Sequence, residues 1–165
     1  MDMSPTGGIS AYKKERGRMD MYNSIRPGQV WLDTEGKRIQ AHGGSVMYLD
    51  GTYYWYGENK EKTTGKDDIW HWGVRCYTSK DLYNWEDKGL IIPPETTDPT
   101  SSIHPTSMMD RPHIIYNKDT KKFVCWLKIM NRDDSQSETI LTADNILGPY
   151  EKVREGLRPL NMSAG

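Results

Sequence analysis

The sequence predicts an all-β fold of two four-stranded antiparallel sheets, arranged as consecutive blades of a β-propeller. Short runs rich in Tyr, Trp, Val and Ile alternate with turn residues along most of the 165-residue chain, which is the pattern of antiparallel strands. Asp50-Gly51 supplies the positive φ angles of a tight hairpin turn between two such runs. Landmarks of the first half recur in the second at an offset of 64 to 70 residues, and four-stranded units repeated around an axis are typical of a propeller. The paired landmarks are Tyr48 with Tyr116, Trp55 with Cys125, Trp85 with Tyr150, and Gly89-Leu90 with Gly156-Leu157.

The hairpin of residues 40–58 is the centre of the first unit. Tyr53 and Trp55 of its second strand point to one side, and Tyr54 and Tyr56 point to the other. A strand that is aromatic on both faces is expected to be packed on both faces, inside a larger β-structure. The strands expected in the first unit are 29–32, 46–49, 53–56, 71–78 and 85–92, and those in the second are 112–116, 123–129, 139–142 and 150–153.

The domain organisation follows from the repeat. Residues 1–26 form a polar arm, with one short helix over 11–22 as its most regular expected structure. Residues 27–98 form the first blade, and residues 99–165 form the second blade and the beginning of a third. The alternative is a pair of unrelated meanders that resemble each other because strands and turns always alternate.

Two blades do not close a propeller, which needs about four to eight. The sequence therefore predicts an incomplete ring whose broad apolar faces are open. Either the chain is a fragment of a longer one, or it is a subunit that closes by self-association through these faces.

The composition excludes several classes of partner. The net charge is −1, with 22 basic and 23 acidic residues, so neither nucleic acid nor a membrane surface is expected to bind by bulk charge. The spacing of Cys76 and Cys125 indicates buried free thiols, with neither a metal site nor a disulfide. No cofactor is expected. No secretory signal or membrane span is present, so the chain reads as cytoplasmic as written, or as secreted or periplasmic if a signal has been removed.

Five polar residues are candidates for a ligand site. The first strand of each propeller blade starts near the axis, where ligands bind. This position holds Gln40 and His42 in the first unit and Asp110 and Arg111, with His113 close by, in the second. Glu58 ends the second strand of the first unit and could reach the same opening.

Each candidate also has a structural interpretation. Asp110 and Arg111 could form a local ion pair in a turn, and His42 could be tolerated beside Gly43-Gly44. Glu58, followed by Asn59-Lys60, could be a solvated strand end. The cluster Trp70-His71-Trp72 could stack on sugar faces or simply pack within a strand.

Two carboxylates across an aromatic cleft suit glycosidic chemistry. One carboxylic acid protonates the leaving oxygen and a second group activates water, with the pair about 6.5–9.5 Å apart when the reaction inverts the anomeric centre. The sequence holds no phosphate-binding loop, nucleophile elbow or metal-spaced His/Cys set. An oligo- or polysaccharide is therefore the expected ligand.

Four segments together resemble the family 43 glycoside hydrolases, in particular the group that contains exo-β-1,3-galactanases. They are residues 39–44 (IQAHGG), 51–58 (GTYYWYGE), 74–85 (VRCYTSKDLYNW) and 110–117 (DRPHIIYN). The resemblance covers residues 27–165. It implies a five-bladed propeller that hydrolyses plant-type galactan or arabinogalactan side chains from non-reducing ends, with inversion.

The resemblance also assigns the candidate residues. Most family members have a general-base Asp at the start of the first blade. This chain has Ala-His-Gly there (41–43) and no Asp, and the galactanase-like group also lacks this Asp. Glu58 and Asp110 match acidic positions that line the sugar site in that group, although Asp110 stands where Glu is usual. The family's pKa-tuning Asp would follow Gly165 and its proton-donating Glu would lie in a fourth blade. No catalytic residue is therefore assigned, and the 165 residues are expected to be inactive alone.

Two further hypotheses compete with this one. The chain could be a non-catalytic sugar-binding unit that closes by self-association, or a structural fragment without retained activity.

Overall fold

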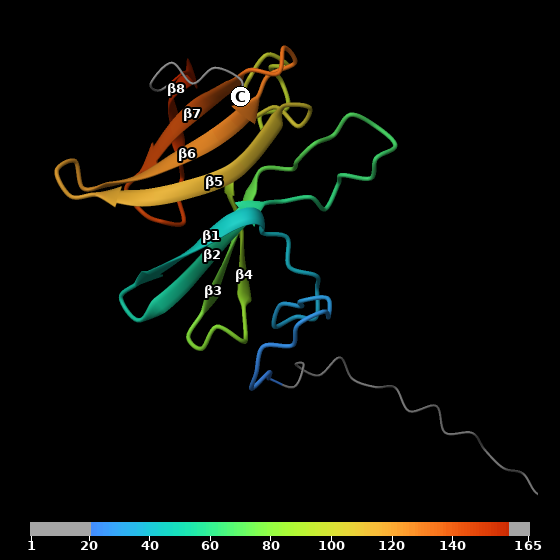
Figure 1. Ribbon diagram of the computed structural model, residues 1–165. Coiled ribbons are helices and arrows are strands. Elements are labelled where there is room, and N and C mark those ends of the chain that lie inside the picture. Colours follow the sequence, from blue (N-terminus) through green and yellow to red (C-terminus); the bar gives the residue numbers. More distant parts are fainter. Residues whose placement is uncertain (1–20, 159–165) are drawn as a thin grey trace, which may run out of the picture.

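The computed structural model describes residues 21–158, which form two four-stranded antiparallel sheets and no helix (Figure 1). Each sheet has its strands in sequence order, as an up-and-down meander. The predicted all-β blades and the open ring are confirmed; the helix expected over 11–22 lies almost wholly outside the described residues. Blade 1 contains β1 (His42–Leu49), β2 (Thr52–Glu58), β3 (Val74–Ser79) and β4 (Glu86–Ile92), and blade 2 contains β5 (Met108–Asn117), β6 (Lys122–Met130), β7 (Gln136–Ala143) and β8 (Glu151–Leu157).

One predicted strand is wrong. Residues 29–32 form no strand, and only an isolated bridge joins Leu32 to Arg38. The Asp33 carboxylate accepts the N–H groups of Glu35 and Lys37, each at 2.9 Å, and so closes a turn directly after it. Trp31 then packs its ring on Trp55, with centroids 5.0 Å apart, so this segment contributes side-chain packing instead of a strand.

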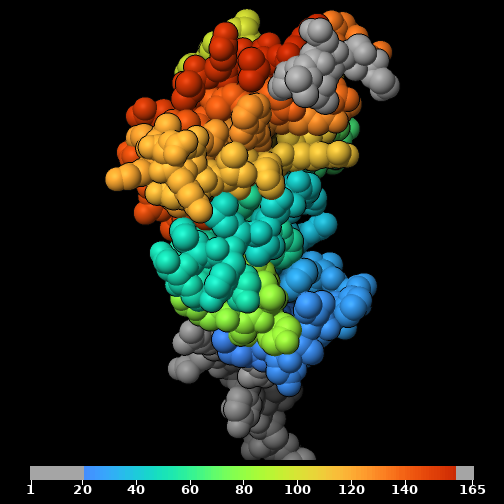
Figure 2. Space-filling model, turned by 60° about the vertical axis from the view of Figure 1, so that its left-hand side comes forward, coloured from blue at the N-terminus to red at the C-terminus, as the bar shows by residue number. Residues whose placement is uncertain are grey.

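The Asp50-Gly51 turn and the two-sided packing of β2 are as expected. Both turn residues have positive φ, 48° and 73°. Tyr54 and Tyr56 pack into the core between the blades, while Tyr53 and Trp55 pack on the opposite face with Tyr77 and Trp85. In Figures 1 and 2, β1 and β2 lie directly against β5, so the first two strands of blade 1 contact the first strand of blade 2.

Tyr56 joins the two blades by hydrogen bonds as well as by burial. Its hydroxyl accepts the Ile114 N–H at 3.0 Å and donates to the Ile114 carbonyl at 3.3 Å. The side chain is almost fully buried, and Cys125 and Ile114 of blade 2 belong to the same core. The blade contact is therefore specified by a polar pair inside an apolar interface.

The repeat extends to backbone irregularities. The register shifts between His42 and Ser45 in β1, and between Asp110 and His113 in β5. In both strands the residue directly after the start of the shift has a left-handed backbone conformation. Gly43 follows His42 with φ 54°, and Arg111 follows Asp110 with φ 49°. Each blade thus begins with the same bulge, and the predicted site residues of both blades lie at it.

Apolar residues are exposed on the two outer faces. Val46 and Tyr48 of β1 are 50% and 62% exposed on the side of blade 1 away from blade 2. Ile115 of β5 is 44% exposed on the far side of blade 2. These are the faces that the sequence predicts to be open. Among residues 21–158, no helix has the length and apolar character of a membrane span.

Candidate functional site

Glu58 is a buried carboxylate at the boundary between the blades. It ends β2 and is only 4% exposed, so its interpretation as a solvated strand end is wrong. Its Oε1 accepts the backbone N–H of Arg111 from blade 2 at 3.0 Å, and its Oε2 pairs with Lys60 Nζ at 2.9 Å. One side chain thus connects β2, the loop that follows it, and the bulge of β5.

Burial raises the pKa of Glu58 above its usual value. Lys60 and the Arg111 N–H oppose this shift, and the nearby charge of Asp110 adds to it. The carboxyl therefore has the features of a group whose ionisation depends on its neighbours, which is common at functional sites. Asp110 directly precedes Arg111, whose N–H bonds Glu58, so both carboxyl residues lie at the junction of the two blades.

The β1 bulge makes room for this carboxylate. A Cβ added at Gly43 would lie 2.8 Å from Glu58 Oε1, and Gly43 has φ 54°, so a side chain there meets both a collision and backbone strain. Arg111 adopts the same left-handed backbone with a side chain present. Non-glycine residues in this region are held by their surroundings, and the bond from the Arg111 N–H to Glu58 is part of that restraint.

Asp110 is half-buried at the start of β5. Its Oδ1 accepts the indole N–H of Trp70 at 3.3 Å, and the same N–H reaches the Met109 carbonyl at 3.1 Å. No ion pair joins Asp110 to Arg111 among residues 21–158, and Arg111 is exposed. The local ion-pair interpretation is therefore wrong, and Asp110 is oriented by the loop between β2 and β3.

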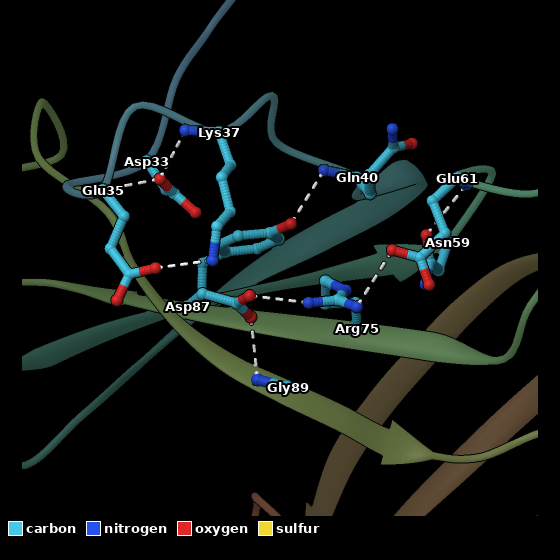
Figure 3. Close-up of polar contacts among 10 residues, drawn as sticks. Asp33, Glu35, Lys37, Gln40, Asn59, Glu61, Arg75, Asp87 and Gly89 are labelled. Atoms are coloured by element: carbon cyan, nitrogen blue, oxygen red, sulfur yellow. Dashed lines mark hydrogen bonds and ion pairs between the residues drawn. The ribbon is translucent and has the colours of Figure 1, made fainter.

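Gln40 and His42 form a separate pair near the same bulge. Gln40 Oε1 lies 3.0 Å from His42 Nε2, and the Gln40 N–H donates to the Tyr77 hydroxyl at 2.9 Å. Figure 3 shows the Gln40 side chain extending away from the sheet, above the ion pair of Arg75 and Asp87. Burial lowers the pKa of His42, and Arg38 and Lys60 lower it further. His42 opposes Glu58 in the ladder, but its side chain bonds Gln40.

The loop of residues 59–73 covers the end of blade 1. Lys60 Nζ donates to the Trp70 carbonyl at 2.7 Å and lies 4.2 Å from the Trp70 ring centroid. Lys62 Nζ lies 3.3 Å from the Trp72 ring centroid. One face of each ring is therefore occupied by an ammonium group and is not free to stack on a sugar. Lys60 is not among the residues predicted from the sequence, and Trp70 is predicted there only as part of a cluster that stacks on sugar or packs.

His71 of this loop is fully buried and neutral. Its Nδ1 accepts the Gly73 N–H at 2.9 Å, and Gly73 has φ 80°. Because this local turn interrupts the chain, β3 begins at Val74 and not at His71 as expected. The packed interpretation of the Trp70-His71-Trp72 cluster therefore holds for its central residue.

His71 should make folding sensitive to acid. Burial lowers the pKa of His71 from 6.5 to about 4. Between these two pH values the imidazole is protonated in the unfolded chain and neutral in the folded chain. We expect the free energy of unfolding to fall by about 3 kcal/mol between pH 6.5 and 4 through this group. Urea denaturation across this range tests it: His71→Asn should lose that part of the pH dependence and exposed His113→Asn should keep it. Parallel curves for the wild type and His71→Asn would contradict the assignment.

Two cavities lie beside this site. A cavity of about 480 Å³ borders His42 and is lined by Trp31, Trp55 and the segment that precedes β1. A cavity of about 540 Å³ lies on blade 2, between the 99–107 segment and the ends of β6 and β8, and contains none of the five predicted residues. Among the described residues, no group of three or more His, Cys, Asp or Glu side chains could hold a metal ion.

The fold is that of propeller blades of a glycoside hydrolase, and a family comparison agrees. Residues 42–155 match the family described as the glycosyl hydrolases family 32 N-terminal domain, so the chain belongs to that family. The solved structures that it resembles include family 43 galactanases and galactosidases, which belong with family 32 to one clan of five-bladed propellers. The family resemblance stated from the sequence is thereby confirmed.

Three solved structures show the extent of the similarity. A family 43 β-1,3-galactosidase shares 38% identity at a TM-score of 0.70, over 82% of this chain and 28% of its own. The exo-β-1,3-galactanase of Phanerochaete chrysosporium, solved with galactose, shares 29% identity at a TM-score of 0.72, over 82% of this chain and 30% of its own. The exo-β-1,3-galactanase of Clostridium thermocellum shares 30% identity at a TM-score of 0.67, over 82% of this chain and 28% of its own.

This chain thus spans less than a third of the length of these enzymes. No match was found among curated proteins.

Proposed function

We propose that the chain supplies the first two blades of an inverting glycoside hydrolase that acts on galactan or arabinogalactan side chains. Glu58, Asp110 and Arg111 bind sugar hydroxyls at the bulge of β5, and Gln40 and His42 border the same opening. The observation that carries this proposal is Glu58, a carboxylate nine-tenths buried between the blades. The solved structures that the chain resembles include an exo-β-1,3-galactanase with galactose bound.

A buried carboxylate is costly unless it is paired and hydrogen-bonded. Glu58 has two partners, the Lys60 ammonium and the Arg111 N–H, and two carboxylate oxygens carry about four lone-pair positions. Acceptor capacity is therefore left for sugar hydroxyls. Hydrogen bonds to a charged acceptor contribute about 1.5–3 kcal/mol each, enough to make one sugar ring bind selectively.

The 165-residue chain alone should bind galactose weakly and hydrolyse nothing. Proton transfer to the leaving group contributes a factor of about 10²–10⁴ in rate. In the proposed enzyme the proton donor belongs to a later blade, outside the part of the relatives that this chain covers. Assays with an aryl β-galactoside and with β-1,3-galactan measure turnover, and calorimetry measures binding. Turnover by the isolated polypeptide would overturn the inactive assignment.

Galactose binding at Glu58 can be tested with a matched control variant. Glu58→Gln should weaken galactose binding at least about tenfold, since a charged acceptor is lost. Glu35→Gln removes an equally negative group that forms only an exposed ion pair with Lys37, and it should leave binding unchanged. Equal affinities for the two variants would contradict a sugar site at Glu58.

The alternative is a non-catalytic sugar-binding unit that closes by self-association. The exposed Val46, Tyr48 and Ile115 on the two outer faces favour it, because each face is apolar and the faces differ, so copies would join head to tail. Solution mass by light scattering distinguishes the two. A discrete oligomer that binds galactose supports the alternative, and a monomer supports the first proposal.

A further inference from the structure

The loop of residues 59–73 holds both site carboxylates through one tryptophan. Trp70 lies near its C-terminal end, and its backbone N–H donates to the Pro105 carbonyl at 2.8 Å. The base of the loop is closed by the Asn59 N–H, which donates to the Gly73 carbonyl at 2.9 Å. Glu61 pairs with Arg75 at 3.2 Å as a further restraint (Figure 3). The loop is therefore tied to blade 1 and to the segment that crosses between the blades.

Trp70 contacts Asp110 directly. Its indole N–H is shared between Asp110 Oδ1 at 3.3 Å and the Met109 carbonyl at 3.1 Å. This hydrogen bond joins the 59–73 loop of blade 1 to β5, the first strand of blade 2. It fixes the direction in which a short side chain, with two rotatable bonds, presents its second oxygen.

Trp70 contacts Glu58 through Lys60. The Lys60 ammonium lies between three groups: Glu58 Oε2 at 2.9 Å, the Trp70 carbonyl at 2.7 Å and the Trp70 ring at 4.2 Å. A lysine has a long flexible stem, and an ion pair alone restrains it weakly. The carbonyl and the ring, both from Trp70, add the restraint that keeps the ammonium on Glu58.

We propose that Trp70 is a positioning residue that sets the orientation of Asp110 directly and of Glu58 through Lys60, so that both face one sugar. This proposal rests on the proposed function for its ligand. Trp70 does not touch the sugar by its lysine-covered face. It transmits the position of the loop to the two carboxylates.

Trp70→Phe tests the contribution of the indole N–H to the arrangement. Phenylalanine keeps a six-membered ring beneath Lys60 and removes the bond to Asp110 and Met109 together with the second ring of the indole. The matched control is Trp72→Phe in the same loop, because the Trp72 indole N–H makes no hydrogen bond within residues 21–158. We expect Trp70→Phe to move the Asp110 carboxyl ¹³C resonance and to weaken galactose binding about tenfold, and Trp72→Phe to do neither.

Lys60→Met tests the second half of the arrangement. It keeps the Trp70–Asp110 bond and removes the charge that opposes the burial of Glu58. We expect the pKa of Glu58 to rise further in ¹³C-detected titrations, with the Asp110 resonance unchanged, and galactose affinity to fall. If Trp70→Phe does not fold, this variant still tests whether Lys60 links the loop to Glu58.

The resonances require no sugar, so the two proposals can fail separately. An Asp110 resonance unaltered in Trp70→Phe, or a Glu58 pKa unaltered in Lys60→Met, would overturn the positioning role. If both variants show their expected changes but the wild-type chain does not bind galactose, the positioning role is supported and the proposed function is contradicted.

Discussion

Gly44→Ala is expected to destabilise the chain by at least about 3 kcal/mol, the upper range for overpacking a well-packed interior. A Cβ on Gly44 would lie 1.8 Å from the Tyr56 carbonyl oxygen and 2.8 Å from the Gly57 Cα. These are backbone atoms of β2, so they cannot move without opening the β1–β2 ladder. The bulge that carries His42 and faces Glu58 would be displaced with it. Urea denaturation followed by tryptophan fluorescence measures the loss.

Gly89→Ala is the matched control for this substitution. Gly89 has φ 79°, and a Cβ there meets no atom within 4 Å. Its cost should be the left-handed backbone alone, about 1–2 kcal/mol. If Gly44→Ala costs no more than Gly89→Ala, the close approach of the two strands at the bulge is not what specifies glycine.

Tyr56→Phe is expected to cost about 3 kcal/mol, since buried groups that lose a hydrogen-bond partner each cost about 1–3 kcal/mol. The Tyr56 hydroxyl is the partner of both the N–H and the carbonyl of Ile114. Phenylalanine would leave these two groups unpaired in the core between the blades. The loss should appear as weaker coupling between blades, with β5 amides exchanging faster in hydrogen-exchange experiments.

Tyr48→Phe is the same chemical change at a position that is 62% exposed. It should alter stability by less than about 0.5 kcal/mol. A Tyr56→Phe variant as stable as Tyr48→Phe would show that the blades are held by apolar contact alone.

The local part of the fold could be predicted from the sequence. The Asp50-Gly51 turn and the two-sided aromatic strand are determined within a few residues, and the structure confirms both. Strand ends were less accurate, since they depend on partners. β5 begins at Met108 instead of Pro112 because it pairs with the far end of β6. The segment 29–32 has strand composition, but a side-chain turn at Asp33 competes with pairing.

The candidate site was predictable in position but not in its interactions. The bulges at the starts of β1 and β5 explain why Gln40, His42, Asp110 and Arg111 were found by position in the repeat. The burial of Glu58 depends on an amide 53 residues away, and no local pattern reports such a contact. Lys60 was missed for the same reason, since a lysine after a strand normally indicates a solvated turn. For Trp70 the sequence indicated stacking on sugar or packing within a strand, and not a bond to Asp110.

The most direct test of this account is a galactose titration of the uniformly ¹⁵N-labelled chain, followed by NMR. The account predicts saturable shifts centred on the Arg111 amide, which donates to Glu58, and on the Trp70 indole N–H, which donates to Asp110. Shifts confined to the 540 Å³ cavity of blade 2, or no shifts at all, would contradict a sugar site at the junction of the two blades.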